Sequence, residues 1–202
     1  SRPPKRSDVL SVFAGLRPLA APRSEGKKTK EISRSHKLIR EKSGLITIIG
    51  GKWTTYRKMA QDTLDLAIRY MHIPTKDCIT ERYQIHGSRK NPDFSDPLYV
   101  YGTDADEIRN LVASSPAMAE KLHPDYAYTV GEVTWLVRNE MPRTLEDVLA
   151  RRLRILFLDA RAAMAMAPKV AGILATEWGK DETWTSAQVK AFNEVASNYI
   201  LN

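Results

Sequence analysis

The stretch from Leu45 to Thr54 reads LITIIGGKWT. Its first five residues are apolar or β-branched, which predicts a short buried strand, and the glycine pair that follows ends this strand. Apolar residues then recur at helical spacing as far as Met71, which predicts a helix over about 54–71. The stretch therefore predicts a strand that turns sharply through two glycines into a helix.

The turn at Gly50 and Gly51 has a chemical use. It brings a helix N-terminus and its unpaired backbone N–H groups to the surface, where a flat or phosphorylated ligand can approach closely. Lys52 adds a positive charge and Thr54 a hydroxyl group. The spaced glycines of a nucleoside-triphosphate loop are absent. On spacing alone the pattern is more often an ordinary tight turn followed by a solvated lysine, so both interpretations stay open here.

The chain divides into regions that differ in predicted secondary structure and composition. Residues 1–73 read as strands plus the helix, with further strands predicted at 9–14 and 31–39. A connector rich in proline and charge follows at 74–97. Residues 98–202 read almost entirely as helix. We therefore expect a mainly α protein in which a partial α/β segment precedes a helical C-terminal domain.

Several helix ends in the last region are marked by their residues. Thr129 and Thr144 each begin a segment that resembles a capping box. Gly179 is typical of a helix C-terminus, and Ser186 is a candidate cap for a last helix. Pro168 lies within the alanine-rich helix before Gly179, where it predicts a bend or a restart.

Arg17 and Arg34 are the candidate anion-binding side chains. Arg17 lies between a predicted strand and Pro18, in a rigid setting that suits two-point binding of a carboxylate or phosphate. Arg34 shares a strand face with His36 if the alternation of the strand holds. A structural ion pair is the competing interpretation for Arg17.

Composition and charge restrict the class of protein. The chain has 43% hydrophobic and 27% charged residues and no apolar run near the ~20 residues of a membrane-spanning helix. Residues 1–90 carry 20 Lys and Arg against 8 Asp and Glu, whereas residues 91–202 carry 11 against 16. The basic first part favours an anionic ligand or surface. Cys78 is the only cysteine, so we expect a reducing compartment and no metal site.

Segments 13–19, 32–36 and 44–60 together resemble the late flavin-domain segment of FAD-dependent glycerol-3-phosphate dehydrogenases. The run GGKWTTYR at 50–57 is the most specific. Segments 144–152, 158–163 and 167–171 resemble the helical C-terminal domain of the same family. The resemblance thus implies that residues 1–73 are the incomplete end of an FAD and substrate domain.

The resemblance implies oxidation of sn-glycerol 3-phosphate to dihydroxyacetone phosphate, with FAD accepting hydride and a quinone-type acceptor taking the electrons. It places Arg17, Arg34 and Lys52 at the substrate, with Arg17 as the catalytic candidate. It places five residues at the flavin ring, namely Gly50, Gly51, Lys52, Trp53 and Thr54. Trp53 departs from the family pattern, in which an aliphatic residue is common.

One family feature has no match in this sequence. The Gly-x-Gly-x-x-Gly fingerprint that holds the FAD pyrophosphate is missing. We therefore expect that the chain alone retains no FAD and is inactive. The family also leaves open a homodimer and a cytoplasmic location, with or without peripheral attachment at the inner face of the cytoplasmic membrane.

Two other classes of protein compete with this interpretation. A basic nucleic-acid-binding module would need its basic residues on a groove-reading helix, but the helical region here is acidic, so we expect no nucleic-acid partner. The helical region could instead serve only packing, dimerisation or membrane docking, alone or within the enzyme.

Overall fold

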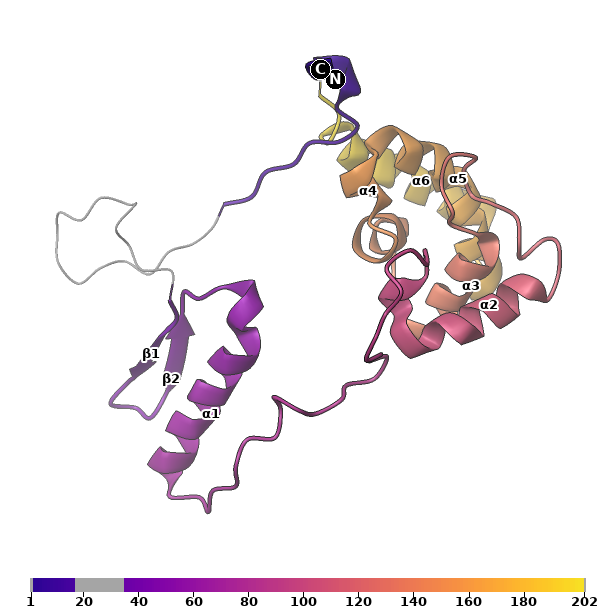
Figure 1. The fold of residues 1–202 in the computed structure, drawn as a ribbon. Coiled ribbons are helices and arrows are strands. Elements are labelled where there is room, and N and C mark those ends of the chain that lie inside the picture. Colours follow the sequence, from indigo (N-terminus) through magenta and orange to yellow (C-terminus); the bar gives the residue numbers. More distant parts are fainter. Residues whose placement is uncertain (1, 17–34, 202) are drawn as a thin grey trace. The chain divides into compact units, whose positions relative to one another are not determined.

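A computed structural model describes residues 2–16 and 35–201 (Figure 1). Contacts divide the chain into two units, which we describe separately. One unit comprises residues 15–85, and the other joins the first 14 residues to residues 86–202. Helices dominate the described residues, and the prediction of a mainly α protein with a helical C-terminal part is confirmed.

Among its described residues, the unit of residues 15–85 contains a hairpin and one α-helix. Strand β1 (Lys37–Arg40) pairs antiparallel with β2 (Ile46–Ile49), and Lys37 lies opposite Ile49. A 3-10 turn over Trp53–Thr55 leads into helix α1 (Tyr56–Met71), which packs against β2. The predicted strand, glycine pair and helix are therefore confirmed. The strand predicted at 31–39 begins only at 37 among the described residues.

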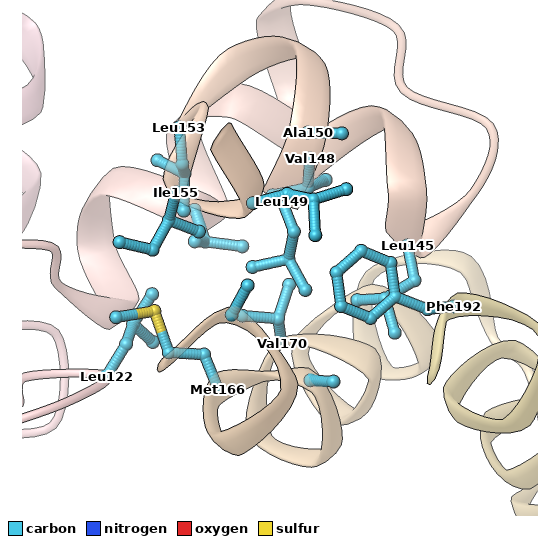
Figure 2. Packing of buried hydrophobic residues seen from close by; sticks show 14 of the residues in the cluster. Leu122, Leu145, Val148, Leu149, Ala150, Leu153, Ile155, Met166, Val170 and Phe192 are labelled. Atoms are coloured by element: carbon cyan, nitrogen blue, oxygen red, sulfur yellow. The ribbon is translucent and has the colours of Figure 1, made fainter. Parts of the chain in front are cut away.

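The other unit is built from helices around one apolar core. These helices are α2 (Ala105–Ala113), α3 (Val130–Asn139), α4 (Ile155–Leu158), α5 (Ala160–Trp178) and α6 (Glu182–Ser197), with a π-helical turn over Asp147–Arg152. Figure 2 shows Leu149, Met166, Val170 and Phe192 gathered in this core, where each is at most 2% exposed. Burial of the apolar side chains that make up this core is the main source of stability for the unit.

Caps predicted from the sequence explain where several helices begin and end. The Thr129 hydroxyl accepts a hydrogen bond from the Glu132 backbone N–H at 3.2 Å. Thr144 and Asp147 exchange the two bonds of a capping box, and Gly179 ends α5 with φ of 62°. Helix α5 passes through Pro168 without interruption, contrary to a restart.

Residues 9–14 form no strand, so that prediction is wrong. They run along the helical unit instead: the Leu10 carbonyl accepts from the Ala160 N–H, and the Val12 N–H donates to the Tyr199 carbonyl. The Phe13 ring meets the Phe157 ring edge-on at 5.1 Å. Contacts thus place this segment with the helices, whereas the sequence grouped it with residues 15–73. The predicted boundaries at 73 and 97 in the whole protein stay predictions.

Candidate functional site

The corner between β2 and α1 requires both of its glycines. Gly50 and Gly51 have φ of +75° and +92°, a left-handed conformation that side chains disfavour. A Cβ atom at Gly50 would lie 2.9 Å from the Ser35 carbonyl oxygen, and one at Gly51 would lie 2.5 Å from the Met59 sulfur. The chain's own packing therefore fixes these two residues, whatever ligand the corner meets.

The three residues after the glycines are exposed to solvent. The Lys52 carbonyl accepts from both the backbone N–H and the hydroxyl of Thr55 at 3.0 Å, which fixes the start of the 3-10 turn. The Lys52 ammonium makes no ion pair with any described residue. The Trp53 ring is 86% exposed and stacks on the Tyr56 ring at 5.6 Å. A cation, an indole face and the Thr54 hydroxyl are therefore presented together.

A polar contact fastens the chain before β1 to helix α1. His36 Nε2 lies 2.9 Å from the Asp62 carboxylate, which also pairs with Lys58 at 3.0 Å. The hydrogen bond from Lys58 lowers the pKa of Asp62, and the His36 contact lowers it further. A Cβ atom at Gly51 would lie 3.3 Å from the His36 Cβ. His36 thus lies beside the glycine corner and helps to position it.

Arg17 and Arg34 lie outside the described residues, so their predicted roles stay predictions. The structure brings together the other five predicted residues, which are consecutive from Gly50 to Thr54. It adds Arg57, which the sequence did not single out. Arg57 donates hydrogen bonds to Gln61, at 3.0 Å, and to the hydroxyl of Thr80, at 3.1 Å. The bond to Thr80 attaches the connector to α1, whereas the bond to Gln61 lies within the helix, and no local sequence signal indicates the attachment.

The helical unit also contains a buried acid whose burial was not predicted from the sequence. Glu132 is 5% exposed, and its carboxylate accepts a hydrogen bond from the Tyr101 hydroxyl at 2.7 Å. Burial raises the pKa of Glu132 to about 7, although the Tyr101 hydroxyl and the Thr129 N–H both favour the charged form. Glu132 lies three residues after the Thr129 cap, which can be read from the sequence, but this capping pattern predicts an exposed acid.

Two features are absent from the part of the chain that the structure describes. No group of three or more His, Cys, Asp or Glu side chains there could hold a metal ion. No helix there is long and apolar enough to cross a membrane.

The structure thus belongs to a class in which a strand, a glycine pair and a helix precede a helical domain. A sequence model described as the C-terminal domain of alpha-glycerophosphate oxidase matches residues 45–185. This match covers well over half of the chain, and the chain belongs to that family. The matched range includes the glycine corner as well as most of the helical unit.

Curated relatives agree with the family match. The chain is 36% identical to a probable mitochondrial glycerol-3-phosphate dehydrogenase of Caenorhabditis elegans, over 97% of this chain and 29% of the relative. It is 32% identical to glycerol-3-phosphate dehydrogenase SDP6, mitochondrial, of Arabidopsis thaliana, over 96% of this chain and 38% of the relative. The chain thus spans about a third of the length of these relatives, and the predicted resemblance is confirmed.

Proposed function

We propose that this chain is the C-terminal part of an FAD-dependent enzyme that oxidises sn-glycerol 3-phosphate to dihydroxyacetone phosphate. The observation that carries the proposal is the corner at residues 50–54, which is exposed except at the half-buried Gly51 and lies inside the range matched by the glycerophosphate oxidase family. The relatives are named as glycerol-3-phosphate dehydrogenases along alignments that include this corner.

The residues of the corner fit one edge of a flavin ring. When bound, FAD supplies a ring that accepts hydride and gains negative charge. The side-chain-free backbone at Gly50 allows close approach, and Gly50 is exposed in the described structure. The start of the following helix carries partial positive charge, which favours an anion there. Trp53 and Thr54 would flank the ring from the 3-10 turn.

Lys52 is the residue of the corner that binds substrate in this proposal. Its ammonium is exposed and has no ion-pair partner among the described residues, so it is available for an anion. A phosphate ester with two negative charges suits a mobile lysine, which acts as a point charge rather than a two-point clamp. Arg17 and Arg34 would complete the substrate site, with Arg17 as the catalytic candidate.

The remaining expectations concern the whole enzyme. A quinone-type acceptor would take the electrons from the flavin, and the enzyme would be able both to associate peripherally with a membrane and to form a homodimer. We keep a cytoplasmic location, or one at the inner face of the cytoplasmic membrane, as the proposal. The relatives' names carry the word mitochondrial, so localisation of a tagged full-length protein is the direct check.

Flavin retention separates the chain from the enzyme that contains it. Purified full-length protein should keep FAD through gel filtration and reduce an artificial acceptor when glycerol 3-phosphate is added. The 202-residue chain, incubated with excess FAD, should elute without flavin absorbance, because no pyrophosphate-binding fingerprint is present. A full-length protein that ignores glycerol 3-phosphate would overturn the function, and stoichiometric FAD on the short chain would overturn its expected inactivity.

A further inference from the structure

The helical unit holds a concave site of about 370 Å³, far along the chain from the glycine corner. This volume is in the range of small-molecule sites. Its walls are mainly apolar and come from the residues before α2, from α2 itself and from the segment between α2 and α3. The apolar lining residues are Pro97, Leu98, Val112, Ala113, Ala119 and Ala127.

Glu132 is the buried polar group of this site. It lines the pocket, is only 5% exposed and forms no ion pair with any described residue. The Tyr101 hydroxyl and the Thr129 N–H donate to its carboxylate. A carboxylate has about four acceptor positions, so two donors leave capacity for another. A donor that enters the pocket can therefore reach an acid for which the described residues provide no cation.

Other charged groups at the pocket do not neutralise this acid. Arg109 also lines the pocket, but its guanidinium is already paired with Asp96 and with Asp106. Asp96 is itself a lining residue. The lining side chains therefore carry one positive and two negative charges when Glu132 is ionised. An apolar pocket with net negative charge and a buried carboxylate is complementary to an organic cation.

We propose that this pocket binds a small primary ammonium on an apolar body, with the ammonium donating to Glu132. The apolar body would lie against the alanine and valine side chains of the wall, and the charge-assisted hydrogen bond would fix its orientation. The proposal concerns the helical unit alone and is independent of the flavin and substrate chemistry above.

Benzylamine is the probe, with benzyl alcohol as its neutral counterpart of nearly equal shape. Each is titrated into the 202-residue chain at about pH 8 and followed by ligand-observed NMR. Benzylamine should bind at least about tenfold more tightly than benzyl alcohol, because a buried charged pair is worth more than a neutral hydrogen bond. Equal affinities, or no binding of benzylamine, would overturn the proposal.

Two variants locate the site. Glu132→Gln keeps the shape and should weaken benzylamine at least about tenfold while leaving benzyl alcohol unchanged. Glu107→Gln is the matched control, because Glu107 bonds the Trp135 indole at 3.0 Å and does not line the pocket. Ala113→Leu narrows the pocket from an exposed position and should weaken both probes. Unchanged benzylamine binding by folded Glu132→Gln, or by Ala113→Leu, would refute the assignment.

Discussion

Glu132 should make the helical unit less stable as pH rises, and Glu132→Gln should remove this effect. Burial raises the pKa of this carboxyl from 4.5 to about 7 in the folded state. The unfolded chain releases the proton near pH 4.5, whereas the folded chain holds it until about pH 7. The free energy of unfolding therefore falls with pH across this window and becomes level above it.

The size of the effect follows from the pKa difference. The difference between a pKa of 4.5 in the unfolded chain and about 7 in the folded chain corresponds to about 3 kcal/mol between the two ends of the window. Asp147 and Glu177 have lowered pKa values, so the stability that they contribute is lost on acidification, at a pH below the window of Glu132. Burial also raises the pKa of Glu140, which leaves a smaller slope of the same sign in the variant.

Urea unfolding followed by helical circular dichroism, repeated between about pH 4.5 and 8, measures the effect. Tyr101 and Tyr128, which lie near the Glu132 carboxyl, are neutral in both proteins across this range, and burial raises their pKa values further above it. The difference in unfolding free energy between wild type and Glu132→Gln should change by about 3 kcal/mol in favour of the variant. Parallel pH profiles for the two proteins would refute the reasoning.

Two further substitutions test the corner and the core. Gly51→Ala should destabilise the corner by about 1–3 kcal/mol, because φ is +92° and the added Cβ would meet the Met59 side chain. The backbone amides of α1 should then exchange faster with solvent. Exchange at the wild-type rate would contradict this prediction. Leu149→Ala should cost about 2–5 kcal/mol, because Leu149 is fully buried; its melting temperature should fall, whereas an unchanged value would contradict the assigned core.

Local signals predicted the elements that depend on neighbouring residues. The strand, glycine pair and helix at 45–71 were readable because periodicity and glycine position act within a few residues. The Thr129 cap and the Gly179 stop were readable for the same reason. The last helix begins at Glu182, earlier than Ser186, because Asp181 provides the cap.

Features that depend on distant contacts were not readable. Val12 has the pattern of a strand residue, but its N–H pairs with Tyr199 at the other end of the sequence. The burial of Glu132 likewise depends on Tyr101 and on the pocket wall, which the capping pattern does not encode. The structure therefore describes the predicted site only at residues 50–54, and the predicted role of Arg17 stays a prediction.

The rate of flavin reduction in the full-length enzyme tests the central claim most directly. Anaerobic mixing with glycerol 3-phosphate bleaches the flavin absorbance, and the dependence of this rate on substrate concentration reports binding. Lys52→Gln should require at least about tenfold more substrate for half-maximal rate, because a phosphate loses its charge partner. Lys42→Gln, an exposed lysine of the hairpin turn, should behave as wild type. Identical curves for Lys52→Gln and wild type would contradict the account.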